Sequence, residues 1–113
     1  QMRPNWELPI HDLMVKNRVT IFFQGHDHVF AHQERDGLIY QSMPNPADDT
    51  FTMFNEAAYL SGTKAPNSGH VRVTVGPNSA QVDYFLSARP QDVSAERSNL
   101  KIAHSYQVQG RSK

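Results

Sequence analysis

Two runs of apolar residues at every second position, over 71–75 and 82–86, constrain the fold of this chain more than any other feature. Valines alternate with polar residues over 71–75, apolar residues recur at every second position over 82–86, and Gly-Pro-Asn-Ser separates the two runs at 76–79. A period of two is typical of a strand with one buried face, so the pattern predicts an antiparallel hairpin. A similar hairpin is predicted over 29–43, where Asp36-Gly37 is a strong two-residue turn signal.

The other elements follow from local patterns. Residues 9–18 carry apolar positions at helical spacing, and alternation over 100–108 predicts a closing strand. Val19–Phe23 is β-branched, aromatic and wholly apolar apart from one threonine, which is typical of a strand covered on both faces. The predicted fold class is α+β, with one helix, a buried strand, two antiparallel hairpins and a closing strand.

Two segments are predicted to lack regular structure. Proline, asparagine, glycine and aspartate are frequent over 44–69, which indicates a long loop of the kind that often forms a lid or a binding surface. A flexible tail is predicted over 109–113. Residues 1–113 are therefore interpreted as a single partial domain.

Composition excludes several classes of function. Eleven basic side chains balance eleven acidic ones, so there is no basic patch of the size that nucleic acid or an anionic membrane would need. The chain has no cysteine, which excludes disulfides, thiolate metal sites and cysteine nucleophiles and is compatible with either a cytoplasmic or an exported protein. The longest apolar stretch is far too short to span a bilayer, and no signal peptide is visible.

Two of the six histidines stand out. Single histidines such as His11, His70 and His104 are interpreted as packed or solvated side chains, whereas His26 and His28 follow Gly25 directly after the apolar strand. Strand ends of layered α/β folds are common places for functional sites. Neutral imidazoles two residues apart on an irregular loop can bind one metal ion or two adjacent ones, and Gly25 is expected to let the backbone turn without a Cβ clash.

The string Val19-Thr20-Ile21-Phe22-Phe23-Gln24-Gly25-His26-Asp27-His28 resembles the last signature of the calcineurin-like metallophosphoesterases, the purple-acid-phosphatase-like family, in which G-H-x-H follows an apolar strand. The helix before this strand and the hairpin over 69–86 are similar to the family's C-terminal part. The resemblance therefore implies the C-terminal part of a layered α/β/β/α sandwich.

The resemblance also implies a mechanism. Two divalent or trivalent metal ions (iron, manganese or zinc) would bind a phosphate ester and a bridging hydroxide that attacks phosphorus. His26 would bind one metal and His28 the other, while Asp27 occupies the variable position. Further along the strand, His32 shares a face with His28 and could border the substrate, as could Gly25.

Other signatures of that family do not occur in the sequence. There is no early D-x-H that fits, no Gly-Asp and no Gly-Asn-His, so most of the implied metal ligands are missing. Two histidines alone cannot hold two adjacent cations, whose repulsion carboxylates must offset. The sequence is therefore interpreted as the C-terminal piece of a larger phosphoesterase. By itself it is expected to be inactive, to need the remainder of its parent chain, and to form a homodimer or exchange strands.

Two other functions stay open. The chain could be a small β-rich binding module whose 44–69 loop presents Phe51, Phe54 and Tyr59 to a partner or saccharide. Alternatively, His26, His28 and His32 could bind a single metal ion without any hydrolysis.

Overall fold

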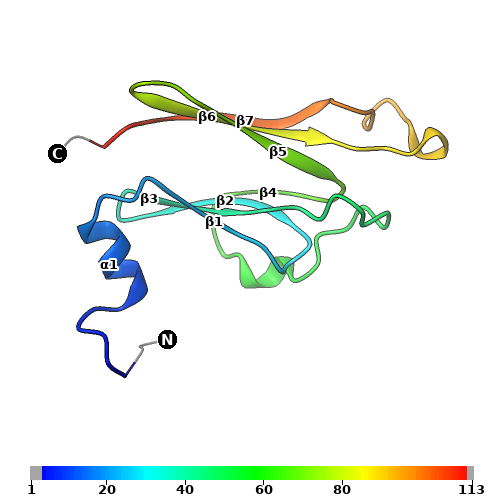
Figure 1. Cartoon of the computed structure of the whole chain (residues 1–113). Helices are drawn as coiled ribbons and strands as arrows, with labels where there is room; N and C mark the ends of the chain where they lie inside the picture. Colours follow the sequence, from blue (N-terminus) through cyan, green and yellow to red (C-terminus); the bar gives the residue numbers. More distant parts are fainter. Residues whose placement is uncertain (1–3, 112–113) are drawn as a thin grey trace.

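A short helix and seven strands build the computed structural model, which describes residues 4–111 (Figure 1). The strands form two sheets that lie one above the other, with strand orders β1-β3-β2-β4 and β5-β6-β7. The fold class is α+β, as the sequence predicts.

The elements follow one another as α1 (Ile10–Lys16), β1 (Ile21–Gln24), β2 (Phe30–Arg35), β3 (Leu38–Ser42), β4 (Thr63–Ala65), β5 (Gly69–Val75), β6 (Ser79–Leu86) and β7 (Ile102–Gln109), with 3₁₀ turns at Glu56–Ala58 and Pro90–Asp92. Helix α1 has seven residues and no buried side chain. None of the helical segments within residues 4–111 has the length and apolar character needed to cross a bilayer.

Both predicted hairpins are present. Strands β2 and β3 pair around Asp36 and Gly37, whose φ angles of 51° and 77° are those of a tight turn with left-handed residues. Strands β5 and β6 pair from Gly69 opposite Leu86 to Val75 opposite Ala80, and β7 extends the same sheet. These hairpins form where the period of two is clearest.

Strand β1 differs from its prediction. It runs parallel to β3 at the edge of the first sheet, where Phe22 is 37% and Phe23 40% exposed. The prediction that this strand is covered on both faces is therefore wrong for residues 4–111. The apolar run does form a strand, but β1 is the edge strand of its sheet and none of its four side chains is buried.

The predicted loop and tail also contain regular structure. Strand β4 lies within 44–69 and pairs with β2, and a 3₁₀ turn precedes it. Gln109 belongs to β7 and pairs with Ser79, while Arg111 donates a hydrogen bond to the carbonyl oxygen of Val19 at 3.2 Å. The first residue of the predicted tail therefore belongs to β7, and its last two residues lie outside the described range.

The two sheets are joined by an inter-sheet core, which we define as Phe30, Ala65, Val71, Tyr84 and Leu86. The rings of Phe30 and Tyr84 stack with centroids 4.6 Å apart, and neither residue is exposed. The buried hydroxyl of Tyr84 donates to the carbonyl oxygen of Pro66 at 2.6 Å, so the polar atom inside this core is satisfied.

A smaller cluster lies on the opposite face of the first sheet. Val29, Ala31 and Tyr59 are buried there together, and Met53 packs against them. Residues 44–69 therefore fold back under β2, next to the segment that carries His26 and His28 (Figure 1).

Candidate metal-ligand site at the end of β1

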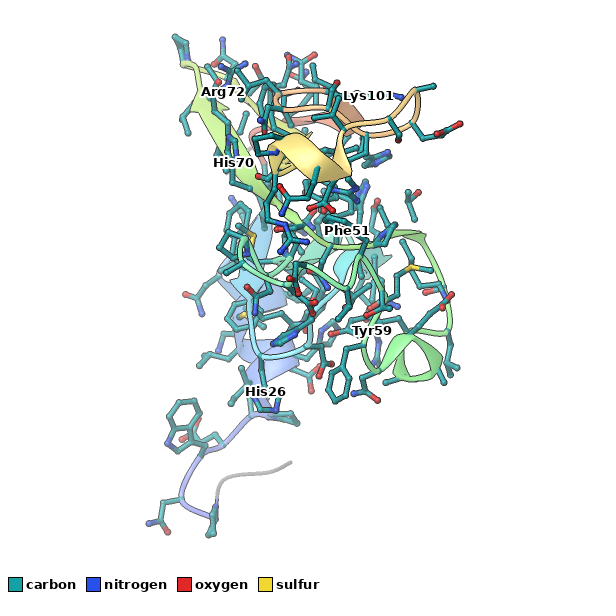
Figure 2. The ribbon with its side chains drawn as sticks, turned by 90° about the vertical axis from the view of Figure 1, so that its right-hand side faces the viewer. His26, Phe51, Tyr59, His70, Arg72 and Lys101 are labelled. Carbon is teal, nitrogen blue, oxygen red and sulfur yellow. The ribbon has the colours of Figure 1, made fainter. Side chains whose placement is uncertain are left out.

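The Gly-His-Asp-His segment lies directly after β1, between this edge strand and β2. His26 is exposed and His28 is partly buried. Figure 2 shows His26 on the far side of Phe51 and Tyr59 from His70 and Arg72. The site is therefore built from β1, the segment that follows it and the 44–69 loop.

The unusual backbone of this segment lies at His26 and not at the preceding glycine. His26 has a φ angle of 100°, a region that side-chain-bearing residues rarely occupy. A Cβ added at Gly25 would meet no atom within 4 Å, and the φ angle of Gly25 is not in the left-handed region. The expectation that Gly25 is needed to avoid a Cβ clash is therefore wrong within the described residues.

The His28 ring is held at both nitrogens. Its Nδ1 lies 2.8 Å from Oδ2 of Asp48, and its Nε2 lies 3.1 Å from Nδ2 of Asn45. A carboxylate can only accept a hydrogen bond and an amide nitrogen can only donate one, so Nδ1 carries the proton and Nε2 presents a lone pair. Asn45 keeps this orientation because its Oδ1 accepts from the backbone N–H of Ala47 at 2.8 Å.

The hydrogen bonds that Asp48 accepts favour its ionised form. Hydrogen bonds from the hydroxyl and backbone N–H of Thr50, followed by the one from His28, lower the pKa of the Asp48 carboxyl below its ordinary value. An ionised carboxylate behind one nitrogen of an imidazole fixes the tautomer and raises the basicity of the other nitrogen. His28 therefore keeps Nε2 unprotonated, and this nitrogen accepts the hydrogen bond from Asn45.

Asp27 connects the same segment to the 44–69 loop. Its Oδ2 accepts hydrogen bonds from the hydroxyl of Tyr59 at 2.8 Å and from Nδ2 of Asn55 at 3.2 Å. The Tyr59 hydroxyl also contacts Ser42 at the end of β3. Asp27 therefore holds the segment between the two histidines against the loop.

His32 faces the second sheet. Its ring stacks on Tyr106 with centroids 3.8 Å apart, and its Nδ1 lies 3.2 Å from Nε2 of His104. The structure therefore joins His32 to β7 and does not bring it together with His26 and His28. This arrangement removes the geometric basis for a three-histidine site.

The aromatic side chains of the 44–69 loop do not form one surface. Tyr59 is buried, and the Phe51 ring lies under the guanidinium of Arg97 at 4.2 Å. Phe54 is 61% exposed, with its ring centroid 5.8 Å from that of His28. Of the three aromatics expected to bind a partner in a binding module, Phe54 is exposed, Phe51 is partly buried and Tyr59 is buried.

The residues of this segment could supply some of the ligands of a metal site. The hydrogen bonds of His28 leave its Nε2 unprotonated, as a metal ligand requires, and His26 is exposed two residues before it. Across residues 4–111, no three histidine, aspartate or glutamate side chains converge so that they could hold a metal ion by themselves. Additional carboxylates would have to come from elsewhere to complete a dinuclear site.

Sequence analysis missed three polar residues of this site, Asn45, Asp48 and Asn67. They belong to the 44–69 loop, where asparagine and aspartate were interpreted only as residues that interrupt regular structure. Their density near prolines was a usable signal that this loop is rigid, but the sequence alone does not pair any of them with His28.

No family model, curated protein or solved structure matches this chain.

Proposed function

We propose that this chain is the C-terminal part of a calcineurin-like metallophosphoesterase that hydrolyses phosphate esters with two metal ions. The observation that supports the proposal best is the state of His28. The motif Gly25-His26-Asp27-His28 lies at the carboxyl end of a strand, and His28 is held there as an Nδ1–H tautomer whose unprotonated Nε2 accepts from Asn45, a contact that a bound metal ion would replace.

In this proposal His26 and His28 each bind a different metal ion. The two metal ions, of iron, manganese or zinc, would supply Lewis-acid activation of water and of the phosphate oxygens. The chain itself contributes two imidazoles, the carboxylate of Asp48 that orients one of them, and the loop that holds this carboxylate in place. Neither Gly-Asp nor Gly-Asn-His occurs in the 113 residues, so the remaining ligands would come from another part of the protein.

Exposure of β1 supports the same proposal. From its register with β3, Phe22 lies on the face of Tyr40, which contacts α1, and Phe23 lies on the face of Gln41, which accepts a hydrogen bond from Tyr106 of the second sheet. Both phenylalanines are more than a third exposed. An edge strand with a large apolar side chain on each face is the kind of surface that proteins normally cover. In the layered sandwich we propose, further strands of the parent protein continue the sheet beyond β1.

The proposal predicts different activities for the piece and the parent. Assays of an aryl phosphate with added Mn²⁺ or Zn²⁺ should show metal-dependent turnover by the parent protein and none by the 113-residue chain. His26→Ala and His28→Ala should each reduce turnover of the parent by orders of magnitude, and the double variant should be little worse than either single one because both residues serve one reaction centre.

Two outcomes would overturn the proposal. Robust metal-dependent turnover by the 113-residue chain alone would contradict its role as a part of the site. Full activity of the parent after His28→Ala would contradict the assignment of the ligands. His70→Ala is the matched control, because His70 is exposed, stacks only on Phe85 and should leave turnover unchanged.

A further inference from the structure

Asn67 is a fully buried amide near the end of the 44–69 loop. Its Nδ2 donates to the carbonyl oxygen of His28 and to that of Thr52, the latter at 3.0 Å, and lies 3.5 Å from Oδ2 of Asp48. Its Oδ1 accepts the backbone N–H of Asn45 at 2.7 Å. A buried amide costs free energy unless its donors and acceptor are all satisfied, and here they are.

These contacts connect Asn67 to every group that fixes the His28 ring. Asn45 donates to Nε2 of His28 and Asp48 accepts from Nδ1, and Asn67 contacts both of these residues as well as the backbone of His28 itself. Removing the Asn67 amide would therefore release the two partners of the ring together, although Asn67 does not touch the ring.

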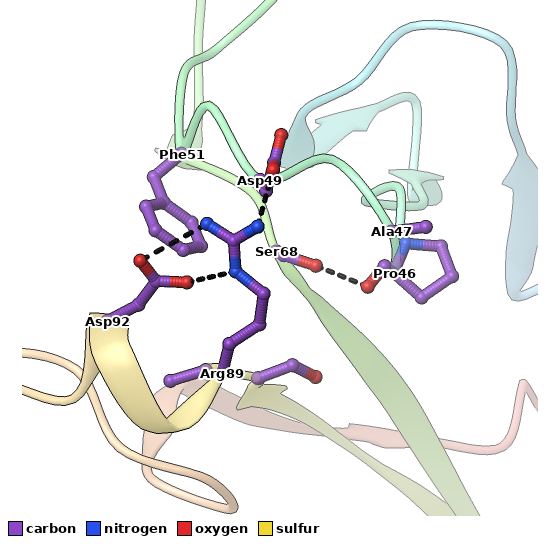
Figure 3. Close-up of a pocket in the computed structure, with 9 residues that line it drawn as sticks. Pro46, Ala47, Asp49, Phe51, Ser68, Arg89 and Asp92 are labelled. Atoms are coloured by element: carbon purple, nitrogen blue, oxygen red, sulfur yellow. Dashed lines mark hydrogen bonds and ion pairs between the residues drawn. The ribbon is translucent and has the colours of Figure 1, made fainter.

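Asn67 is itself held from the second sheet. The guanidinium of Arg97 donates to the carbonyl oxygen of Asn67 at 2.6 Å and to those of Ser68 and Ser87 at 2.9 Å. The hydroxyl of Ser68 donates to the carbonyl oxygen of Pro46, the residue after Asn45 (Figure 3). The contacts at Pro46, Asn67 and Ser68 therefore restrain the loop at, or next to, residues that hold His28.

A cavity of about 290 Å³ lies next to these contacts, and Pro46 and Ser68 are among the residues that line it. Arg89 lies along it and binds Asp49 at 2.7 Å and Asp92 at 2.6 Å, so its guanidinium is paired on both sides (Figure 3). Asp48 and Asp49 are adjacent in the sequence, and one contacts His28 while the other contacts Arg89. The ion pair between Arg89 and Asp49 therefore connects the segment after β6 to the 44–69 loop beside this cavity.

We propose that Asn67 is the positioning residue of this site: through Asn45 and Asp48 it keeps His28 in the Nδ1–H tautomer, with an unprotonated Nε2 that accepts from Asn45. The tautomer is a property of this chain alone. Its consequence for metal affinity rests on the proposed function.

The first test measures the tautomer directly. Long-range ¹H–¹⁵N correlation spectra of the 113-residue chain at pH 8 distinguish protonated from unprotonated ring nitrogens. The wild-type chain should show His28 with a protonated Nδ1 and an unprotonated Nε2. In Asn67→Ala the His28 signals should shift toward the Nε2–H form, which is the favoured tautomer of free histidine. Asn17→Ala is the matched control, since that exposed amide donates only to the carbonyl oxygen of Leu13.

Two results would overturn the proposal. One is a wild-type chain whose His28 is in the Nε2–H form, which needs no variant to observe. The other is an Asn67→Ala chain that keeps its β5–β6 cross-strand contacts and an unchanged His28 tautomer. If Asn67→Ala does not fold, Asn67→Leu serves instead, because leucine has a similar size and its side chain can neither donate nor accept a hydrogen bond; an unchanged tautomer there has the same meaning.

The second test measures metal binding in the parent protein. Asn67→Ala should weaken Zn²⁺ or Mn²⁺ affinity by about 10- to 100-fold, the usual effect of removing a group that orients a ligand. The outcomes of this test distinguish a failure of the proposed function from a failure of the positioning role. A parent that binds no metal with wild-type residues would refute the proposed function and leave the tautomer result standing, whereas an unaltered affinity in Asn67→Ala would refute the positioning role in metal binding.

Discussion

The inter-sheet core and the β1 edge contain the same kinds of side chains in very different surroundings. Phe30 and Tyr84 stack at zero exposure between the sheets, while Phe22 and Phe23, on a strand of the same sheet, stay 37% and 40% exposed. The difference teaches that one packing interface of this molecule is complete and another is open. An open apolar edge is what we expect where a further part of a protein docks.

Removing an aromatic ring should reveal this contrast most strongly. Phe30→Ala should lower the free energy of unfolding by about 3–5 kcal/mol, because it leaves a cavity against Tyr84. Phe22→Ala should cost only about 1 kcal/mol, since its ring is partly solvated already and loses mainly an edge contact with Tyr40. Urea denaturation of both variants measures the difference, and equal losses would mean that the β1 edge is as well packed as the core.

Two glycines, one beside the inter-sheet core and one after β1, allow the same two regions to be compared at the backbone. A Cβ at Gly69 would overlap the carbonyl oxygen of Phe85, so Gly69→Ala should cost about 1–3 kcal/mol of stability. At Gly25 the same change meets open space and should alter stability by no more than about 0.5 kcal/mol. Thermal unfolding of the two variants tests this. A marked loss of stability in Gly25→Ala would show that glycine is required before His26.

Self-association should depend on the β1 edge. We expect the isolated chain to dimerise or exchange strands at micromolar concentration. Phe23→Lys should weaken that association at least about tenfold, or about 1.4 kcal/mol, because it places a charge in the contact. Sedimentation velocity gives the measurement, with Leu60→Lys as a control at a side chain that is 92% exposed. A compact wild-type monomer, or a Phe23→Lys chain that associates as before, would contradict the prediction.

The smallest effect concerns the histidine pair between the sheets. Burial lowers the pKa of both His32 and His104, and for His32 the facing His104 lowers it further while Glu34 opposes the shift. In the unfolded chain both values return to about 6.5, so the unfolded state binds protons more readily. Stability should therefore be complete above about pH 6.5 and fall as the pH drops below it.

Denaturation at pH 7.5 and pH 5.5 measures this slope. The double variant His32→Gln/His104→Gln should flatten it, and His70→Gln should not, because His70 lies exposed on the second sheet. A wild-type chain that is equally stable at both pH values would show that the pair between the sheets does not resist protonation.

Part of the site followed from the sequence and part did not. The Gly-His-Asp-His segment is recognisable because its residues are contiguous and follow an apolar strand. Asn45, Asp48 and Asn67 are far from His28 in sequence, and a turn-forming asparagine looks the same whether or not it binds a ring. His32 shows the opposite error, since alternation assigned it the face of His28 but could not say that β7 covers this face.

The sequence by itself determined the class of the fold, the two hairpins, the closing strand and the position of the histidine segment, because all of these depend on periodicity and turn chemistry over fewer than twenty residues. Only the tertiary structure decided that β1 lies at an edge, that β4 forms inside the expected loop, and that His28 is held by a buried asparagine. These features depend on which segments meet in space, and hydrogen bonds between segments 17–39 residues apart leave no local pattern along the chain.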